Sequence, residues 1–560
     1  MSGIDWLVLC FTLLSIIGYG IYKSRGTKSM QGYLLADRQL PWYHVGFSVM
    51  ATQASAITFL SAPGQGYTDG LRFVQFYFGL PLAMVVLCIT FIPIFHKLNV
   101  YTAYEYLEKR FDGKTRLLTA FLFLLQRGLS TGITIYAPAI ILSTILGIDI
   151  LYTIVANGVL VISYTVYGGT KAVSHTHLLQ MSIIFASLFL AAWLVVHLLP
   201  ENVSFTDALH IAGKMNKLNA LDTEFDLNNR YNLWSGLIGG FFLQLSYFGT
   251  DQSQVGRYLT GSSINQSRMG LVMNGLIKIP MQFFILLIGV LVFSFYQFHQ
   301  EPVFFNKVET EKLQHSSYSK EYQELQSAFQ KANAYKLSCV NELVEAVHAK
   351  NKTAIESTGH KLQIAEAQSR AVKKQVQVLI EKNNALADSN DSNYIFLRFV
   401  TEQLPVGVVG LLIAIIFLAA MGSTASGLNS LASTTVIDFY KRVIKKGGSD
   451  ADYVSATRKA TYAWGVFCII TAIYASKLGN LIEAVNILGS LFYGTILGIF
   501  IVAFYLRKVG GNAVFISALI AEVFVVGAWL MELTAFLWLN VIGCLLVVIF
   551  SMAFQKLSKK

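Results

Sequence analysis

The stretch Ala419-Ala420-Met421-Gly422-Ser423-Thr424-Ala425-Ser426-Gly427-Leu428-Asn429-Ser430 lies inside a hydrophobic segment that runs from about 406 to 436. Small residues at this density let membrane helices pack closely. The hydroxyl oxygens among them can coordinate a hard cation such as sodium. If a second helix breaks at the same depth, the two helices together form an ion site. This stretch therefore predicts half of a cation site inside a helical bundle.

The composition is typical of a polytopic membrane protein. Of the 560 residues, 54% are apolar and 13% are charged, and many segments reach the roughly 20 apolar residues that cross a bilayer. We therefore expect an all-α protein with about thirteen transmembrane helices, at 4–22, 43–66, 75–96, 117–145, 150–167, 174–199, 234–252, 269–298, 396–436, 460–477, 481–506, 512–531 and 533–554.

The basic residues predict the orientation in the membrane. The formal net charge is +11, but the positive residues lie in short loops, which indicates orientation and not a nucleic-acid surface. With the N-terminus outside, nearly every basic loop falls on the inner side, including the loops that carry Lys97, Lys109, Arg110, Lys441, Arg442, Arg507 and Lys508. We expect a multi-pass protein of the plasma (cell inner) membrane with a cytoplasmic C-terminus.

A long polar segment at 299–394 would lie on the outer side. Apolar residues at helical spacing, such as Leu343, Val347 and Leu362, predict two helices in a hairpin. The segment shows no chemistry of its own. It is therefore expected to be either a solvated helical addition or a lid or partner-binding element, with the partner unknown.

The predicted span at 43–66 carries polar residues through its middle, namely Thr52, Gln53, Ser55 and Thr58. Pro63 removes one helical donor near its end. A broken helix inside a bundle can direct freed carbonyls at a cation and freed amides at a solute. A kinked packing helix is the alternative that this segment leaves open.

Several motifs, in a consistent order, resemble the sodium/solute symporter family, which includes sodium-coupled carriers of sugars, proline, iodide, monocarboxylates and vitamins. They are Gly66-Tyr67-Thr68-Asp69-Gly70-Leu71, Tyr101-Thr102-Ala103-Tyr104-Glu105-Tyr106-Leu107-Glu108-Lys109-Arg110-Phe111, Tyr164-Thr165-Val166-Tyr167-Gly168-Gly169, Gln252-Ser253-Gln254-Val255-Gly256-Arg257-Tyr258, and Leu428-Asn429-Ser430 followed by Asp438-Phe439-Tyr440. The resemblance implies an inverted-repeat core of five plus five helices. It also implies that the first helix of each repeat is broken, and that transport proceeds by alternating access.

On this basis we expect five regions. They are an extra N-terminal helix and cytoplasmic loop at 1–42, the first repeat and the start of the second at 43–298, the outer helical insertion at 299–394, the rest of the second repeat at 395–508, and C-terminal helices at 509–560.

The resemblance also implies a sodium site. Its ligand positions fall on the backbone carbonyls of Ala51, Ala54 and Ala419, and on the two neighbouring positions Gly422 and Ser423, where the family offers hydroxyls. Gly422 has no side-chain oxygen, so this chain departs from the pattern. Because Ala425 lacks a hydroxyl as well, we expect one sodium ion and not two.

His177 is a second departure. It lies in Ser174-His175-Thr176-His177-Leu178-Leu179-Gln180, where many relatives carry an aspartate close to the ion. The imidazole either serves as a structural hydrogen-bonding group beside the site or, since histidine titrates near neutral pH, tunes the ion site or couples protons.

Substrate positions follow from the resemblance to the galactose-type carriers. They fall on Gln53, Thr58, Tyr77, Gln244, Lys278 and Asn486, with Tyr247 as an aromatic inner gate. Ile57 and Tyr77 stand where those sugar carriers use glutamates, which weakens the sugar hypothesis. Basic groups in the spans, Arg127 and Lys278, favour an organic anion, although Arg127 also fits a structural ion pair.

We therefore predict a sodium-coupled secondary active symporter that imports a small polar organic solute. The solute is an organic anion, such as a monocarboxylate or sialic acid, or a sugar. The alternatives are a proton-coupled or uncoupled carrier of the same fold, or a transporter-like membrane sensor. No nucleophile–base pair stands in the spans, so we expect neither an enzyme nor a cofactor or metal beyond sodium.

Overall fold

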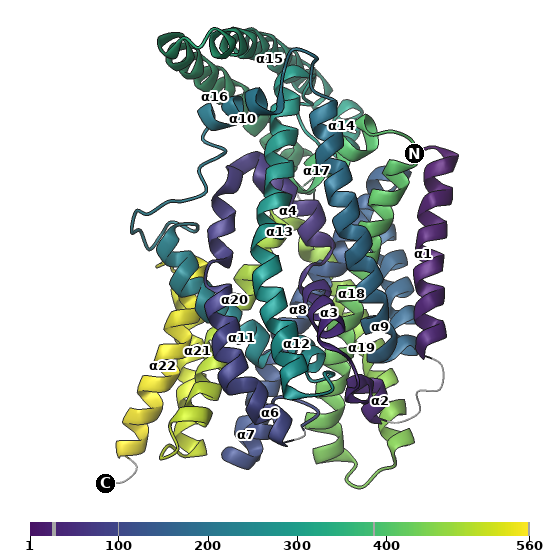
Figure 1. The fold of residues 1–560 in the computed structure, drawn as a ribbon, viewed down its shortest axis with the longest axis vertical. Helices are drawn as coiled ribbons and strands as arrows, with labels where there is room; N and C mark the ends of the chain where they lie inside the picture. Colours follow the sequence, from purple (N-terminus) through teal and green to yellow (C-terminus); the bar gives the residue numbers. More distant parts are fainter. Residues whose placement is uncertain (25–29, 99, 385–386, 558–560) are drawn as a thin grey trace.

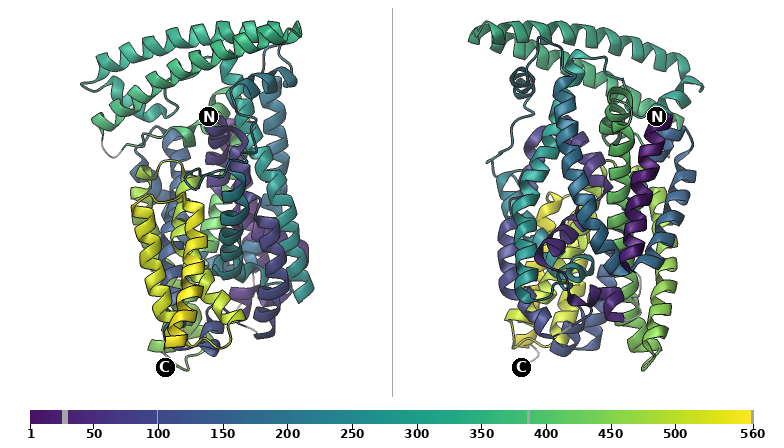
Figure 2. Two further views of the ribbon diagram at one scale, coloured as in Figure 1. Left: turned by 90° about the vertical axis from the view of Figure 1, so that its left-hand side faces the viewer. Right: turned by 45° about the vertical axis from the view of Figure 1, so that its right-hand side comes forward.

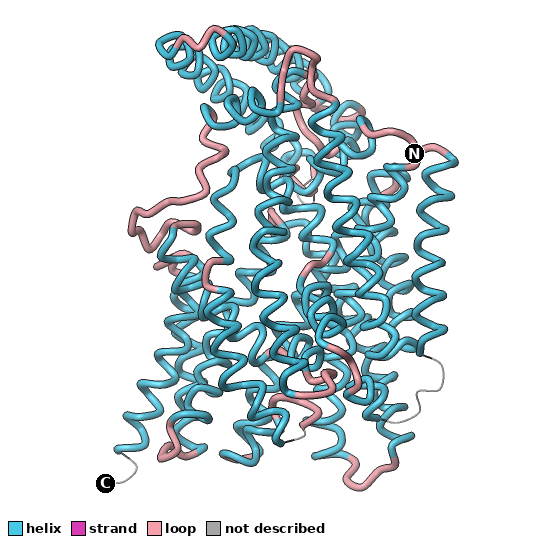
Figure 3. The backbone as a smooth tube through the Cα atoms, viewed as in Figure 1, coloured by secondary structure: helices cyan, strands magenta, loops and turns pink. Residues whose placement is uncertain are grey.

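The computed structural model describes residues 1–24, 30–98, 100–384 and 387–557. Within these ranges the chain folds into helices and loops without a β-strand (Figures 1 and 3). The described residues include 9 helices that are long and apolar enough to cross a membrane. The all-α polytopic fold is thus confirmed, whereas the number of thirteen spans stays a prediction.

The part of the chain before the insertion forms the larger share of the bundle. Its elements are α1 (Gly3–Ser24), α2 (Met30–Leu35), η1 (Ala36–Arg38), α3 (Trp42–Gln53), α4 (Ala56–Asp69), η2 (Gly70–Tyr77), α5 (Leu80–Val86), η3 (Leu87–Phe91), α6 (Ile92–Leu98), α7 (Glu105–Arg110), α8 (Gly113–Leu146), α9 (Ile150–His197), α10 (Phe205–Lys214), η4 (Ser235–Gly239), α11 (Gly240–Thr250), α12 (Gln252–Tyr258) and α13 (Ile264–Phe298).

The insertion and the C-terminal part complete the molecule. Their elements are α14 (Lys307–Gln314), α15 (Ser319–His348), α16 (Lys352–Asn383), α17 (Ser392–Gln403), α18 (Val408–Thr434), η5 (Thr435–Ile444), α19 (Asp450–Tyr474), η6 (Ala475–Leu478), α20 (Leu481–Tyr505), α21 (Gly511–Leu530) and α22 (Phe536–Leu557). Figure 1 shows the N-terminus at the same end as α15 and α16, and the C-terminus at the opposite end.

Two helices are interrupted, at the places where the inverted-repeat fold requires it. The first interruption separates α3 from α4 at Ala54 and Ser55, whose backbones leave the helical region. The second separates α11 from α12 at Asp251, which has φ −77° and ψ 119°. Pro63 lies inside α4 and does not make the break. The cause is Ser55, whose hydroxyl accepts the Ile57 amide at 3.2 Å and so begins a new helix.

The segment expected to hold two spans, at 150–167 and 174–199, differs from the prediction. Both fall in α9, which is helical from Ile150 to His197. The sequence predicted a loop between these two spans, at 168–173. In the structure α9 packs against α1, α3, α8, α18 and α19, and helical backbone satisfies its own hydrogen bonds there.

The insertion forms a helical hairpin of α15 and α16 across one end of the bundle (Figure 2). A buried charge cluster joins it to α4. Glu301 accepts hydrogen bonds from Tyr67 of α4 and from the ammonium groups of Lys336 and Lys373, with Lys336 at 2.7 Å. Burial alone would raise the pKa of Glu301, but the two lysines outweigh it and hold that pKa below its usual value.

Glycines let α4 approach its neighbours closely. A Cβ atom at Gly289 of α13 would lie 2.0 Å from the carbonyl oxygen of Pro63, and one at Gly64 would lie 1.9 Å from that of Ser392 in α17. Real Cβ atoms do not come so close to backbone, so only glycine fits. The half-helix α4 is therefore clamped between α13 and the helix that follows the insertion.

We predict that Gly289→Ala lowers the thermal stability of the detergent-purified protein, because the added methyl group must push α13 away from α4. Overpacking of this kind costs about 1–3 kcal/mol. Gly527→Ala in α21 is the matched control, because no atom lies within 4 Å of a Cβ there. Equal melting temperatures for the two variants would show that this contact does not hold α4 in place.

Candidate functional site

The break between α3 and α4 frees two backbone carbonyls. In a continuous helix the Ser55 amide would donate to the Ala51 carbonyl, but here it donates to Gln53 O at 3.1 Å. The Thr58 amide donates to Ser55 O at 3.0 Å and not to Ala54 O. Buried carbonyls that lose their helical donors need another partner. Ala51 and Ala54, both expected as sodium ligands, therefore offer oxygens that a cation can bind.

The small-residue stretch of α18 packs against both α3 and α4. The Thr52 and Ser426 hydroxyls lie 3.3 Å apart and join α3 to α18. The Ser423 hydroxyl donates to the carbonyl of Ala419 at 2.9 Å, so its own lone pairs stay open to a cation. The Thr424 hydroxyl is buried and has no hydrogen-bond partner among the described residues.

His177 explains the glycine at position 422. Its Nδ1 atom and the Ser48 hydroxyl lie 3.2 Å apart, which joins α9 to α3. A Cβ atom at Gly422 would lie 2.9 Å from His177 Nε2 and 3.0 Å from Gln180 Oε1. The imidazole therefore fills the space that a side chain at position 422 would need. The two departures from the family pattern, Gly422 and His177, therefore lie in contact with each other. The separate sequence motifs did not reveal this contact.

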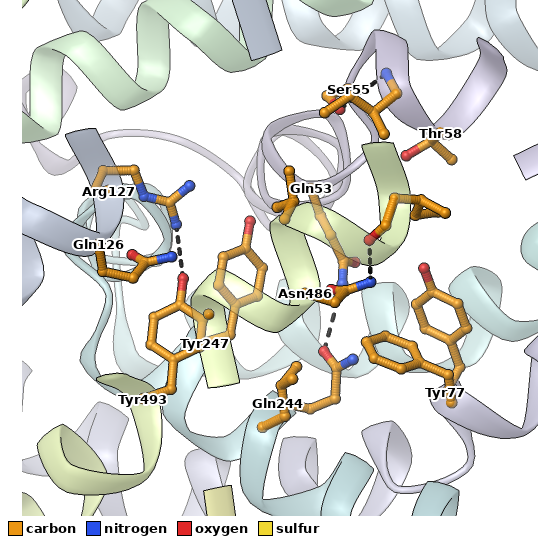
Figure 4. Close-up of a pocket in the computed structure, with 16 residues that line it drawn as sticks. Gln53, Ser55, Thr58, Tyr77, Gln126, Arg127, Gln244, Tyr247, Asn486 and Tyr493 are labelled. Atoms are coloured by element: carbon orange, nitrogen blue, oxygen red, sulfur yellow. Dashed lines mark hydrogen bonds between the residues drawn. The ribbon is translucent and has the colours of Figure 1, made fainter. Parts of the chain in front are cut away.

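A cavity beside this break collects most of the predicted substrate residues. Gln53, Thr58, Tyr77, Gln244 and Asn486 all line it, as does Tyr247. Figure 4 shows Gln53, Gln244 and Asn486 together, with Tyr77 on one side and the predicted gate residue Tyr247 on the other. The cavity holds about 90 Å³, whereas ligand sites commonly span about 300–1,000 Å³. A larger solute therefore requires the surrounding helices to move apart.

The amides in the cavity have hydrogen-bonding capacity to spare. Gln53 Nε2 donates to Gln244 Oε1 over a long 3.5 Å. The remaining amide atoms, Gln53 Oε1 and Gln244 Nε2, are buried and have no hydrogen-bond partner among the described residues. They present one acceptor and one donor to a polar solute. Asn486 is occupied differently, because its Nδ2 donates to Ile482 O at 2.7 Å.

A charged cluster closes the cavity on the Tyr247 side. Arg127 of α8 forms an ion pair with Asp251, the residue at the break between α11 and α12. Asp251 also accepts from the Tyr493 hydroxyl at 2.7 Å and from the Ser253 amide at 2.8 Å. The Arg127 guanidinium lies 5.5 Å from the centre of the Tyr247 ring. The ion pair thus ties the second broken helix to α8 and α20.

Lys278 does not line the cavity. It is fully buried on α13 behind Tyr77, with its Nζ atom 5.6 Å from the centre of that ring. Its ammonium group has no hydrogen-bond partner among the described residues. The sequence also missed two polar residues that do line the cavity, Gln126 and Tyr493. Gln126 could have been found as a polar side chain within a predicted span, whereas Tyr493 gives no such signal.

Comparison with known proteins identifies the family. The pattern of the Sodium:solute symporter family matches residues 33–317 and 371–521. The chain belongs to this family. Between the two matched ranges, the unmatched segment 318–370 covers α15 and the first part of α16. Sodium-coupled transport of a solute is the activity of the family, and its members are transporters.

Relatives differ in what their names say they carry. The chain is 26% identical to the sodium/sialic acid symporter NanT of Aliivibrio fischeri, over 98% of this chain and 92% of NanT. It is 25% identical to a sodium/glucose cotransporter of Vibrio parahaemolyticus, over 100% of this chain and 91% of the relative. The human sodium/iodide cotransporter is 32% identical, but the match covers only 48% of this chain and 42% of that protein.

The fold has a solved counterpart. The structure matches that of a substrate-bound, outward-open Na⁺-coupled sialic acid symporter with a TM-score of 0.75, over 99% of this chain and 98% of the other. The sequence identity is 22%, so the match concerns the fold. It supports the expected inverted-repeat architecture with a broken first helix in each half.

We predict that Asp251→Asn destabilises the protein by about 3–5 kcal/mol, because it leaves the Arg127 guanidinium buried without its counter-charge. The double variant Arg127→Gln/Asp251→Asn should recover at least about 1 kcal/mol of that loss, as expected for residues in contact. Denaturant unfolding in detergent measures both. Strictly additive effects would show that the ion pair does not couple α8 to the broken helix.

Proposed function

We propose that the protein uses a sodium gradient to import a small organic anion, such as sialic acid or a monocarboxylate, by alternating access. The observation that carries the proposal is the break between α3 and α4. Both helices pack against α18, which carries hydroxyl groups, and the residues that flank the break line a polar cavity. A neutral sugar is the second candidate, because one relative is named for glucose.

The sodium ion would bind the carbonyls of Ala51, Ala54 and Ala419 together with the Ser423 hydroxyl. Gly422 would contribute at most its backbone, because His177 occupies the space beside it. Three carbonyls and a hydroxyl are hard oxygen ligands that suit a small cation. This set of ligands has one hydroxyl where the family pattern offers two, so we expect weak sodium affinity and a single ion.

Coupling would follow from the geometry of the break. Gln53 ends α3 and Thr58 lies in the first turn of α4, so these two solute-facing residues flank the same carbonyls that would hold sodium. A cation that orders the break also fixes both side chains for the solute. By thermodynamic linkage, the solute must then raise the affinity for sodium by the same factor.

Positive charge near the cavity favours an anion. Arg127 lines the cavity, and Lys278 lies buried behind Tyr77 without a hydrogen-bond partner among the described residues. A buried ammonium group without a counter-charge is costly. A carboxylate entering beside Tyr77 would offset that cost. On the opposite, Tyr247 side of the cavity, a carboxylate would have to compete with Asp251 for Arg127.

The orientation and the regions of the chain complete the proposal. The end that carries Lys109, Arg110, Lys441 and Arg507 would face the cytoplasm with the C-terminus, and the hairpin end would face outside in the plasma (cell inner) membrane. The repeats at 43–298 and 395–508 would form the transport core. The region 1–42, the insertion at 299–394 and the region 509–560 would surround it.

A proton-coupled carrier is the alternative, favoured by the buried imidazole of His177 beside the site. Uptake into proteoliposomes separates the two hypotheses. Labelled sialic acid, lactate, glucose and proline should be offered with an inward sodium gradient or with an inward proton gradient. We expect accumulation of an anion driven by sodium alone. Accumulation driven by protons without sodium would contradict the proposal.

Ser423→Ala should raise the sodium concentration for half-maximal uptake about tenfold. The change removes the only side-chain oxygen of the proposed shell, and a hydrogen bond or ligand contact to a charged group contributes about 1.5–3 kcal/mol. Sodium titration of uptake measures the change. Thr424→Ala, which removes the neighbouring hydroxyl, is the matched control and should titrate like the wild type. A reversed result would assign the ligand role to Thr424.

Gly422→Ser should reduce uptake at least about tenfold, because the new Cβ atom collides with His177. The double variant His177→Asp/Gly422→Ser removes the collision with the imidazole and supplies a carboxylate and a hydroxyl group. It should therefore recover uptake and require less sodium than the wild type. His177→Asn/Gly422→Ser separates relief of the collision from the effect of charge. Full activity of Gly422→Ser alone would contradict the linked packing of these residues.

A further inference from the structure

A polar hollow of about 550 Å³ lies between the insertion and the substrate cavity. We name it the vestibule. Four cationic side chains line it, and they come from three separate segments: Arg72 from η2, Lys217 and Arg230 from the loop between α10 and η4, and Arg370 from α16. Asp69 and Glu483 are the carboxylates in its lining.

The vestibule shares three elements with the substrate cavity. Asp69 ends α4, whose first turn carries Thr58 in the cavity. Arg72 is the third residue of η2, whose last residue is Tyr77. Glu483 lies in the first turn of α20, three residues before Asn486 of the cavity. A solute that crosses the vestibule toward the cavity therefore follows the same three elements.

Three of the four cations of the vestibule are accessible. The side chains of Arg72, Arg230 and Arg370 are 40%, 60% and 55% exposed. Each has a mostly buried carboxylate partner, which is Asp222 at 3.8 Å, Glu483 at 3.0 Å and Glu366 at 3.0 Å. Because a guanidinium group carries five N–H donors, its exposed donors remain open to an anion.

Lys217 is the buried cation in the lining of the vestibule. Its ammonium group donates to the Thr68 carbonyl, and it lies 4.9 Å from the centre of the Phe293 ring. Burial, followed by repulsion from Arg370, lowers the pKa of Lys217 to about 8. The group stays charged at neutral pH. Glu366, Asp69 and Glu301 offset part of this lowering of the pKa, so Lys217 lies among both positive and negative groups.

We propose that the vestibule is an outer binding site that collects a carboxylate-bearing solute before it enters the substrate cavity, and that the insertion supplies Arg370 to this site. The inference rests on the anionic solute of the proposed function. The lining carries four cationic side chains and two carboxylates, and an excess of one charge sign raises the local concentration and the association rate of the opposite charge. Arg370 is the last residue of the internal segment, 318–370, that the family pattern leaves unmatched.

The test uses the full-length protein in proteoliposomes with labelled sialic acid, or labelled lactate if uptake selects a monocarboxylate. Arg370→Gln should raise KM about three- to tenfold and leave the maximal rate and the sodium titration unchanged. Arg370→Lys should keep most of the wild-type KM. Lys361→Gln is the matched control, because it makes the same change of charge on α16 outside the vestibule, and it should behave like the wild type.

The dependence of uptake on salt provides a second measurement. Choline chloride at constant sodium should raise the KM of the wild type, because salt screens the attraction between the solute and the cations. The same salt should raise the KM of Arg370→Gln by a smaller factor. An unchanged KM in Arg370→Gln, or an equal salt effect in both proteins, would overturn the vestibule proposal. Failure of the wild type to take up any anion would instead contradict the proposed function.

Discussion

The break at Ala54 and Ser55 is the constraint on which the rest of the structure depends. In a membrane interior, each backbone carbonyl without a partner is costly, so a helix is interrupted only where something else satisfies the freed groups. Here the Ser55 hydroxyl satisfies one amide, and the carbonyls of Ala51 and Ala54 lose their helical donors where α3 and α4 pack against α18. Because residues on both sides of the break also line the cavity, the proposed ion and solute would act on the same few residues.

The neighbours of the break show how one site is adjusted by packing. Gly422 appears as the loss of a ligand when it is considered alone, and His177 as the loss of a charge. Together they are complementary shapes, since the imidazole occupies the space that the glycine leaves. The polar face of α3 then bonds to His177 through Ser48. The proposed sodium site would keep its backbone oxygens and would have an imidazole where the resemblance implies two oxygen-bearing side chains.

The insertion is joined to the transport core by charge and not by apolar packing alone. Glu301 links Tyr67 of α4 to two lysines of the hairpin, and close glycine contacts hold α4 against α13 and α17. The half-helix that flanks the cavity is therefore in direct contact with the hairpin. The same hairpin places Arg370 in the lining of the vestibule, on the route that we propose for the solute.

Much of the architecture could be predicted from the sequence. Apolar length identified the spans, small residues identified α18 as a packing helix, and polar residues in mid-span marked the broken helix, because each of these is a local property of one segment. The family motifs added the order of the helices. The position of the first break was less well predicted, since Pro63 is tolerated inside α4 while Ser55 begins a new helix.

The sequence by itself determined an all-α membrane protein with a broken helix and a hydroxyl-bearing partner helix. It could do so because hydropathy and hydrogen-bonding capacity are properties of each residue type. Only the tertiary structure decided that His177 fills the space beside Gly422, that Asp251 neutralises Arg127, and that Lys278 lies behind Tyr77 and outside the cavity. These relations join residues that are 124 to 245 positions apart on different helices, and their distances depend on how the helices pack, which no local pattern records.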